Sequence, residues 1–501
     1  MKKIATTKVC RATVVTISVA AVMLFSLPGC SRQIQKQVQS FSSTCRNAVS
    51  QLGSSLNTAS QALFETVSSG KPSSGRPSSP ASPASRVAAV TTKKSAVASN
   101  RGKTDVKSVK KISSGLPASS TPKKTVPANY APSSNYPEMQ HHADYQSLGT
   151  EAERELYRQI GQSVYQIAFQ KSSSGYYPVA QISCSGSISE AQIRVAMLAY
   201  MDDNPQVFWL ADVYGFGTHD GRTILQLYSV VSPDECSASI KQLDSAVSSV
   251  IRSIPSGLSE FDREEYLFNY IVGRCTYDNA AVTDTSRWQA FTSYGVIVNG
   301  TAVCEGYSRA MQLLAGYAGL NCTLVRGSSG GVGHMWNQVE VGGAWYHLDL
   351  TWCDNSILIY NYYNITDSII SQTHQIGPSV SELSEEQIDG GLVQYNLSLH
   401  ACNSTEANYF KYKGIPVTAQ NGSDDAQIIG ALSEDLKQGK RSIAFYIGGD
   451  YNSTVSGIVS GKLSVWLSAA EKRAGKSLGN GSTKYVTDQA DKGMTIQVSY
   501  R

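Results

Sequence analysis

The sequence predicts an α+β protein, because helical and strand-like patterns alternate over most of its 501 residues. Apolar residues recur every three to four positions after Cys304, which is typical of a helix with one buried face. Residues 339–346 flank a Gly-Gly pair with apolar residues, as in a β-hairpin. A third observation is a Ser-, Pro- and Lys-rich segment over 31–142, which predicts a disordered tether ahead of the folded part.

The first 30 residues have the pattern of a signal peptide. A basic start precedes an apolar stretch over 14–27, which is too short and too early to favour a stable spanning helix. The stretch ends in Leu27-Pro28-Gly29-Cys30, which resembles a bacterial lipobox. The resemblance implies that Cys30 carries a lipid that anchors the protein to the cell membrane on its extracytoplasmic face. An ordinary cleaved signal with an incidental cysteine is the alternative.

Charge separates the tether from the folded part. Residues 31–142 contain 15 basic and 3 acidic residues, whereas residues 143–501 contain 24 basic and 36 acidic residues. The overall charge of +4 therefore combines a basic tether with a folded part near −12. A solvated spacer is the simple interpretation, and adhesion to anionic lipid headgroups or wall polymers is the alternative. We expect no nucleic-acid partner, because no basic folded surface with interleaved aromatic residues is evident.

Residues 143–256 are expected to form an accessory α+β region. A possible capping box at Ser189 and Gln192 predicts a helix through Tyr200. Residues 207–210 and 223–227 are strand-like. Two further helices are indicated by single apolar faces, formed by Leu156, Ile160, Val164 and Ile167, and by Ile240, Leu243, Val247, Ile251 and Ile254.

Residues 257–385 hold the most specific chemistry, which begins at Cys304. The apolar spacing places Cys304 in the first turn of a helix that ends before Gly319, a residue suited to a left-handed C′ position. Unpaired N–H groups and the helix dipole favour an anion there and could stabilise an oxyanion. Residues 294–300 are expected to form a short extended segment and a turn that place Cys304 at the start of this helix. A small buried hydrophobe is the alternative interpretation of a lone cysteine.

The hairpin brings an imidazole and a carboxylate to one face. If Val341 faces Ala344 across the Gly-Gly turn, His334 lies diagonal to Asp349 on the same side of the sheet. Diagonal partners lie about 7–8 Å apart, within reach of long side chains. Asp349 could therefore orient the His334 ring, as the third member of a catalytic triad does. A Gly-rich loop over 326–333 is expected to let this strand end approach the Cys304 helix closely.

His347 shares that face and is the rival of His334. It lies nearer the turn and farther from the Gly-rich loop, so a strand histidine with a structural hydrogen bond is the preferred interpretation. Asp354 is interpreted as a loop-capping carboxylate. The tryptophans Trp336, Trp345 and Trp352 are expected in the core or in a pocket wall.

Residues 386–501 mix helical and strand-like patterns and are expected to form a small C-terminal α/β domain, either a binding module or a structural cap. Seven cysteines are left once Cys10, Cys30 and Cys304 are set aside. This odd number, without close CxxC pairs, argues against a zinc site and against a fully paired disulfide framework.

The motifs around these residues are similar to those of the transglutaminase-like superfamily, particularly its bacterial exported members. The resemblance covers about residues 257–375 and is carried by Cys304-Glu305-Gly306-Tyr307, His334-Met335-Trp336-Asn337, Trp345-Tyr346-His347-Leu348-Asp349-Leu350-Thr351-Trp352, Tyr277-Asp278 and Asn364-Ile365-Thr366-Asp367. It implies a papain-like core in which a cysteine-bearing helix packs on an antiparallel sheet.

By that resemblance Cys304 is the nucleophile, His334 the acid and base, and Asp349 the residue that orients it. The implied activity is that of a cysteine hydrolase or acyltransferase acting on peptide or amide bonds, with protein or cell-wall peptides as substrates. The calcium sites of animal transglutaminases have no recognisable counterpart, so no metal and no cofactor are expected and hydrolysis is favoured. Trp288 and Asn299 are candidates for a second oxyanion donor. The alternative is a surface binding or scaffold protein that keeps the fold without turnover.

Overall fold

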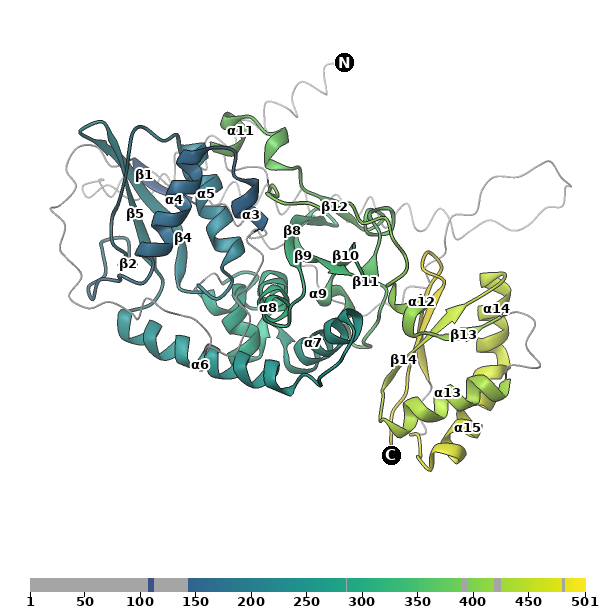
Figure 1. Cartoon of the computed structure of the whole chain (residues 1–501). Coiled ribbons are helices and arrows are strands. Elements are labelled where there is room, and N and C mark those ends of the chain that lie inside the picture. Colours follow the sequence, from purple (N-terminus) through teal and green to yellow (C-terminus); the bar gives the residue numbers. More distant parts are fainter. Residues whose placement is uncertain (1–106, 112–142, 285, 390–393, 419–424, 480–482) are drawn as a thin grey trace, which may run out of the picture. The chain divides into compact units, whose positions relative to one another are not determined.

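The computed structural model describes residues 107–111, 143–284, 286–389, 394–418, 425–479 and 483–501 (Figure 1). The expected signal peptide and Cys30 lie outside these residues, as does most of the expected tether. One piece of the tether is described: Lys107–Lys111 forms strand β1, which pairs in parallel with β4 (Leu210–His219).

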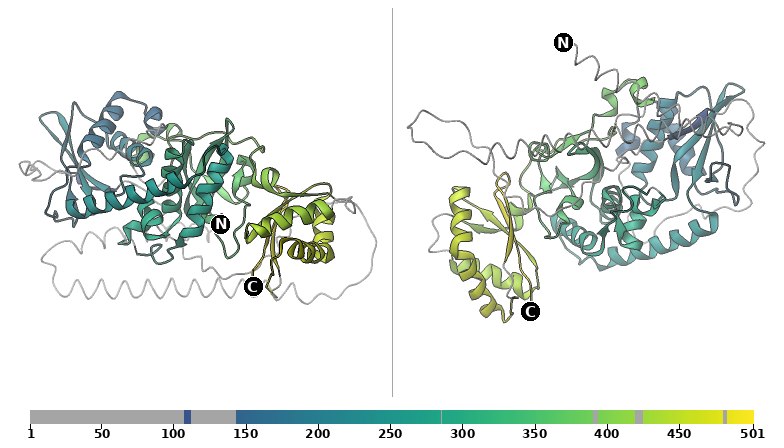
Figure 2. Two further views of the ribbon diagram at one scale, coloured as in Figure 1. Left: turned by 60° about the horizontal axis from the view of Figure 1, so that its bottom comes forward. Right: turned by 180° about the vertical axis from the view of Figure 1, so that it is seen from behind.

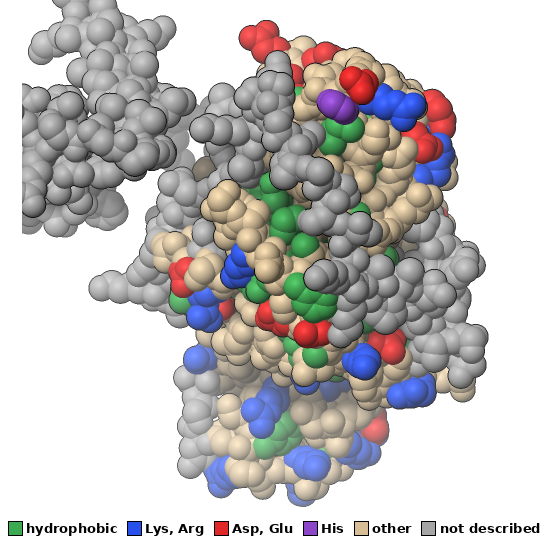
Figure 3. All heavy atoms as spheres, turned by 90° about the vertical axis from the view of Figure 1, so that its left-hand side faces the viewer, with side chains coloured by type: hydrophobic (Ala, Val, Ile, Leu, Met, Phe, Trp, Pro, Cys, Tyr) green, Lys and Arg blue, Asp and Glu red, His purple; other side chains and the backbone are tan. Residues whose placement is uncertain are grey.

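The accessory region contains a mixed sheet in the order β1-β4-β5-β2, with β3 also paired to β5. Its predicted capping box at Ser189 and Gln192 is confirmed at the start of α5 (Glu190–Asp203). The other elements are β2 (Tyr177–Pro178), β3 (Ile182–Cys184), β5 (Arg222–Ser229), α3 (Ala143–Ser147), α4 (Glu151–Ser163) and α6 (Pro233–Ser253). On the side of the molecule shown in Figure 3, side chains of both charges are mixed.

One predicted strand is wrong in part. Residues 207–209 form a turn, and β4 begins only at Leu210. Another turn precedes them over residues 204–207 and is closed by the Val207 amide, which donates to the Asn204 carbonyl at 2.9 Å. The apolar side chains of Phe208 and Trp209 are buried in the core, which explains the apolar run without a strand. Trp209 Nε1 donates to the Val164 carbonyl at 2.9 Å. An apolar run alone does not distinguish a strand from a buried turn.

In the core, a cysteine-bearing helix packs on an antiparallel sheet, as predicted (Figure 1). The helix is α8 (Cys304–Tyr317), and the sheet has the order β11-β10-β9-β8-β12. The Asn337 side chain of β9 joins the two layers, because it donates to the Ser308 carbonyl of α8 at 3.0 Å. The strands are β8 (Cys322–Ser329), β9 (Val332–Val341), β10 (Ala344–Leu348), β11 (Tyr363–Ile365) and β12 (His374–Ile376).

Short elements surround this core. They are α7 (Glu260–Arg274), β6 (Thr276–Tyr277), η1 (Trp288–Phe291), η2 (Gly295–Asn299), β7 (Thr301–Ala302), α9 (Leu350–Cys353), α10 (Asp367–Ile370), η3 (Val380–Glu382) and α11 (Glu385–Asp389). The strands β6 and β7 pair in parallel, which places Tyr277 beside Ala302, two residues before Cys304.

Two expectations about the approach to the site are wrong. Residues 295–299 form the π-helical turn η2 instead of an extended segment, although Gly300 then makes the expected turn with φ +72°. Residues 326–329 belong to β8, so the expected Gly-rich loop shrinks to the tight turn at Gly330 and Gly331. Glycine is needed in β8 for another reason: a side chain at Gly327 would collide with the Gln375 backbone of β12.

The C-terminal residues form a sheet with helices packed on it (Figure 2). The sheet has the order β13-β14-β16-β15, and its buried apolar side chains form a core of their own. Its elements are α12 (Tyr409–Lys413), β13 (Ile415–Val417), α13 (Asp425–Lys437), β14 (Ser442–Ile447), α14 (Tyr451–Gly457), η4 (Ile458–Lys462), α15 (Leu463–Ala474), β15 (Lys484–Asp488) and β16 (Gly493–Gln497). Across all the described residues, no helix combines the length and the apolar character that a membrane span requires.

Candidate active site

Cys304 differs from the six other cysteines that the structure describes. It is half-buried, whereas the others are buried, and none of the seven is in a disulfide. Burial raises the pKa of each buried thiol, for example to about 11 at Cys184 and to about 12 at Cys402. Cys304 opens α8 after Val303, whose side chain does not cap the helix. The N–H groups of this first turn are therefore not used by a side-chain cap and suit an anion.

The predicted register of the hairpin is confirmed. Val341 pairs with Ala344, and the ladder continues to the pair Asn337 and Leu348. The strand β10 ends there, so Asp349 is not a strand residue as expected but the N-cap of α9, where its Oδ1 accepts the Trp352 amide at 3.1 Å. The cap turns the carboxylate toward β9, and His334 Nε2 lies 2.6 Å from Asp349 Oδ2.

Hydrogen bonding fixes which nitrogen of His334 faces the sulfur. A carboxylate only accepts hydrogen bonds, so Nε2 is protonated and donates its N–H to Asp349. The Cys304 side chain lies close enough to the ring to raise its pKa, and because Asp349 holds Nε2, the ring nitrogen left to face the sulfur is Nδ1. The structure therefore brings together the three residues that the sequence singled out, in the order sulfur, ring and carboxylate.

Electrostatics keep the His334 ring charged at neutral pH. Burial by itself lowers the pKa of His334, but the Asp349 carboxylate and the Cys304 sulfur together raise it to about 10. Burial would raise the pKa of Asp349, yet His334 and His374 hold it well below its usual range. A buried carboxylate thus stabilises a buried imidazolium beside the thiol, which is the setting that activates a nucleophilic cysteine.

His374 is a member of this site that the sequence analysis missed. It is buried on β12, and its Nε2 donates to the same Asp349 Oδ2 at 3.1 Å. Its Nδ1 is 2.8 Å from the Thr373 hydroxyl, which donates to it. His374 reaches Asp349 because β12 pairs with β8, an antiparallel pairing in which His374 faces Ser329. The isolated sequence Thr-His-Gln-Ile contains no signal for that pairing.

Tyr277 is a second residue near the sulfur. The resemblance pointed to Tyr277-Asp278 without a role, and the structure places the Tyr277 side chain near Cys304, because burial and the charges of Cys304 and Asp349 raise the pKa of the tyrosine. Trp288 and Asn299 remain predictions as candidates for an oxyanion donor. Trp288 packs against Phe208 and Tyr294, and Asn299 ends η2.

His347 makes structural hydrogen bonds, as predicted. Its Nδ1 accepts from Trp336 Nε1 at 3.0 Å, so its Nε2 carries the proton and donates to Asp367 Oδ1 at 2.8 Å. His347, Asp367 and Cys402 are close enough to hold a metal ion, but a metal on Nε2 would have to displace that proton while Trp336 occupies Nδ1. His334, Asp349 and His374 form a second such group. A metal there would break the hydrogen bond between His334 and Asp349, so the expectation of a metal-free site remains a prediction.

A buried ion network fastens α8 and its sheet to the accessory region. Arg326 of β8 forms a bidentate ion pair with Asp202 of α5. Arg309 of α8 contacts Asp202 Oδ1 at 3.4 Å and Glu305 Oε1 at 2.9 Å, and it donates to the Met201 carbonyl at 2.8 Å. These four side chains are two acidic and two basic groups, and the buried Asp144 lies beside Asp202, where burial raises the pKa of Asp144. The network fixes the first turns of α8, on which Cys304 lies.

Comparison with known proteins agrees with this geometry. Residues 249–350 match the family model of the transglutaminase-like superfamily. Kyphoscoliosis peptidase from Homo sapiens is 29% identical over 122 residues, which make up 22% of this chain and 18% of the relative. Kyphoscoliosis peptidase from Mus musculus is 26% identical over 141 residues, which make up 26% of this chain and 21% of the relative.

The chain thus matches only about a fifth of the length of these curated relatives. A solved structure of a TGase aligns at 18% identity over 34% of this chain and 50% of that chain, with a TM-score of 0.21, which is too low to support an argument. The matched segment holds Cys304, His334 and Asp349. Through this segment, the core of the chain is similar to the transglutaminase-like superfamily.

Proposed function

We propose that this protein is a cysteine hydrolase or acyltransferase that acts on peptide or amide bonds. One observation carries the proposal: the His334 ring lies beside the half-buried Cys304, whose sulfur raises the pKa of the ring, and 2.6 Å from the buried Asp349 carboxylate. A thiol, a base and an orienting acid in hydrogen-bonding reach of each other are the signature of nucleophilic catalysis.

Each side chain has a defined role in the proposed reaction. The Cys304 thiolate attacks the carbonyl carbon, and the carbonyl oxygen gains negative charge in a tetrahedral intermediate. When the carbon–nitrogen bond breaks, His334 Nδ1 gives its proton to the departing amine and a thioester remains on Cys304. Asp349 keeps Nε2 protonated, which directs Nδ1 to the sulfur. The N–H groups that begin α8 are suited to stabilise the oxyanion.

Water or an amine can then resolve the thioester. Attack by water, with His334 as the base, releases an acid and restores the thiol, whereas attack by an amine forms a new amide. We favour hydrolysis, which agrees with the word peptidase in the names of the matched relatives. The proposed substrates are proteins or the peptides of a bacterial cell wall.

The proposal also includes the location of the enzyme at the cell membrane. The pattern over residues 1–30 supports export and a lipid on Cys30, which would hold the enzyme at the extracytoplasmic face of the membrane. Mass spectrometry of the mature N-terminus tests this part separately. A mature chain that begins at a diacylated Cys30 supports it, and an unmodified cysteine or a different first residue contradicts it.

Alkylation of Cys304 tests the catalytic part. The intact chain is treated with iodoacetamide between pH 5 and pH 9, and the rate at each cysteine is followed by mass spectrometry. We expect Cys304 to react faster in the folded protein than in the urea-unfolded chain below neutral pH, because the charged His334 favours the reactive thiolate. The buried Cys353 serves as the control in the same sample and should react more slowly when folded. No acceleration at Cys304 would contradict the proposal.

The scaffold alternative predicts a different result in cells. A Cys304→Ala chain removes one sulfur from a half-buried position and should fold normally. A binding protein would keep its cellular role with this change, whereas an enzyme would lose it. A comparison of wall peptides and surface proteins from cells with and without the Cys304 thiol would also reveal the substrate.

A further inference from the structure

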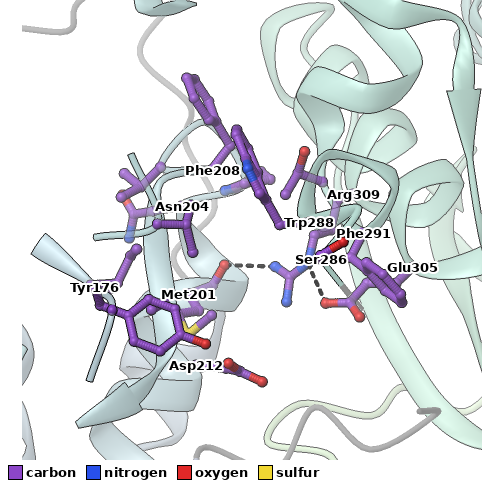
Figure 4. A pocket seen from close by; sticks show the side chains of 17 residues that line it. Tyr176, Met201, Asn204, Phe208, Asp212, Ser286, Trp288, Phe291, Glu305 and Arg309 are labelled. Carbon is purple, nitrogen blue, oxygen red and sulfur yellow. Dashed lines mark hydrogen bonds and ion pairs between the residues drawn. The ribbon is translucent and has the colours of Figure 1, made fainter. Parts of the chain in front are cut away.

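A cavity of about 390 Å³ lies between the accessory region and the first turns of α8 (Figure 4). Its volume is typical of a pocket for a small ligand or a side chain, which range over about 300–1,000 Å³. Its walls are aromatic: Tyr176 and Phe208 line one side, and Trp288 and Phe291 line the other. Phe208 and Trp288 lie with their rings 6.1 Å apart and almost parallel, at 7°.

The charged groups of this cavity do not balance. Arg309 lies in the wall, but its guanidinium contacts Glu305, Asp202 and the Met201 carbonyl. Asp212 of β4 adds a negative charge, and among the described residues from 143 onward no basic side chain forms an ion pair with it. The described hydrogen bonds of Glu305 use Oε1, and none of them involves Oε2. The cavity therefore has one more acidic than basic side chain.

The two carboxylates also act on each other. Burial raises the pKa of Glu305, Arg309 and Arg326 lower it, and the nearby Asp212 raises it further. A cation bound between Asp212 and Glu305 would relieve this repulsion. Aromatic faces add to the attraction, because the negative face of an aromatic ring attracts a cation.

The cavity lies next to the proposed nucleophile, because one of its lining residues is the neighbour of Cys304 in the sequence. Glu305 follows Cys304 in α8, and Val303 donates its amide to the Ala290 carbonyl of η1 at 2.9 Å. The close approach of η1 requires Gly306, because a Cβ there would lie 2.6 Å from the Ala290 oxygen. The wall that contains Trp288 and Phe291 is thereby held against the start of α8.

We propose that this cavity binds the positively charged ammonium group of a substrate side chain, with Asp212 and Glu305 as its counter-charges. The proposal rests on the proposed function, since it gives the enzyme a preference for peptides with a lysine-like residue beside the bond that is cleaved. The bound ammonium group would serve to recognise the substrate and would not act as the nucleophile that attacks the thioester. Two carboxylates keep an amine protonated, and a protonated amine has no lone pair with which to resolve a thioester.

Binding to the full-length protein tests the site without the need for turnover. The probe is Nα-acetyl-L-lysine methylamide, and the matched probe replaces lysine with norleucine, which has a similar shape but no charge. Affinities are measured by isothermal titration calorimetry at neutral pH. We expect the lysine probe to bind at least about tenfold more tightly than the norleucine probe, a difference that corresponds to about 1.4 kcal/mol.

Asp212→Asn should reduce this preference to within about twofold, because it removes one of the two counter-charges with little change in shape. Glu305→Gln keeps an oxygen for Arg309 and tests the second carboxylate. The control is Asp220→Asn, which changes an exposed aspartate in the hairpin between β4 and β5. Asn tolerates the positive φ of 48° at that position, so the control should fold and keep the full preference.

Equal binding of the two probes to the unaltered protein would overturn the proposal, and so would an unchanged preference in both cavity variants. A lysine preference that depends on Asp212, in a protein whose Cys304 shows no accelerated alkylation, would support the cavity and contradict the proposed function. A third probe, a wall-type peptide with the free amine of a diamino acid, identifies the source of the ammonium group. Tighter binding of this peptide than of the lysine probe indicates wall peptides, and the reverse indicates proteins.

Discussion

Asp349→Asn is the substitution that most directly tests the electrostatics of the proposed site. Asp349 Oδ2 accepts the Nε2–H groups of His334 at 2.6 Å and of His374 at 3.1 Å, while Oδ1 accepts the Trp352 amide at 3.1 Å. Every group that faces the carboxylate is thus a donor. Asparagine has one accepting oxygen and one donating NH₂, so in either orientation its NH₂ faces another donor.

In the less costly orientation, the asparagine oxygen faces the rings of His334 and His374, and the hydrogen bond from the Trp352 amide is lost. That loss costs about 0.5–1.5 kcal/mol, and the loss of a charged partner for His334 costs about 1.5–3 kcal/mol. We therefore expect the free energy of unfolding to fall by about 2–4 kcal/mol at pH 6. The substitution also removes the negative charge of Asp349, which is the main group that raises the pKa of His334. Burial should then lower this pKa from about 10 to below about 6.5.

The sign of the pH dependence follows from the two shifts. A raised pKa at His334 stabilises the folded state fully below about 6.5, and this contribution is lost as the pH rises through about 10. A lowered pKa at Asp349 stabilises the folded state above about 3.9, and this contribution is lost as the pH falls further. The stability difference between the unaltered protein and the variant should therefore be largest between about pH 4 and 6.5 and should shrink toward pH 10.

Two measurements check this prediction: urea unfolding across pH 4–10, and the rate of Cys304 alkylation over the range in which the protein stays folded. The variant should lose the fast reaction of Cys304 below neutral pH. Asp354→Asn is the matched control, because Asp354 lies in the same segment and accepts from the Tyr307 hydroxyl at 2.7 Å, a bond that asparagine can keep. If the variant shows the stability and alkylation profile of the control, Asp349 does not hold the charge of His334 and the reasoning is refuted.

Three further predictions concern buried polar groups. His374→Leu should lower kcat about tenfold with little change in KM, and His374→Gln, which keeps a donor toward Asp349, should restore most of it; equal loss in both variants would indicate a purely structural role. Arg326→Met should destabilise the protein by about 3–5 kcal/mol in urea unfolding, because Asp202 is left buried with only the more distant Arg309. Adding Asp202→Leu should recover part of that loss, and failure to recover any would contradict the charge argument. Burial raises the pKa of Glu264 to about 8, so the folded state retains a proton there and stability should fall as pH rises from about 4.3 to about 8; Glu264→Gln should remove this slope, and an unchanged slope would refute it.

Local patterns in the sequence were sufficient for the residues that lie along one hairpin and one helix. The Gly342-Gly343 turn fixed the register, because side chains alternate with a period of two and a turn of known length allows one pairing. The start of α8 at Cys304 and its end before Gly319, at φ +74°, followed from apolar spacing and from the conformational freedom of glycine. His334, Asp349 and Cys304 could be selected together on this basis.

The same local patterns predicted extended segments wrongly where apolar residues are buried in turns and not in the strands of a sheet. Residues 207–209 and 295–299 looked extended because they are rich in apolar residues, and both are folded into turns that the core encloses. The glycines of the expected loop before His334 proved to serve two purposes. Gly330 and Gly331 make a tight turn, while Gly327 admits the neighbouring strand.

The sequence by itself determined the hairpin register, the cysteine at the start of a helix and the face shared by His334 and Asp349. The tertiary structure alone decided that His374 reaches Asp349, that Arg326 pairs with Asp202 across 124 positions, and that residues 175–230 and 286–309 enclose one cavity. The physical reason is the range of the interactions. Hydrogen-bond periodicity and turn geometry act between near neighbours in the chain, whereas these contacts exist only after distant segments have been packed together by the burial of apolar surface.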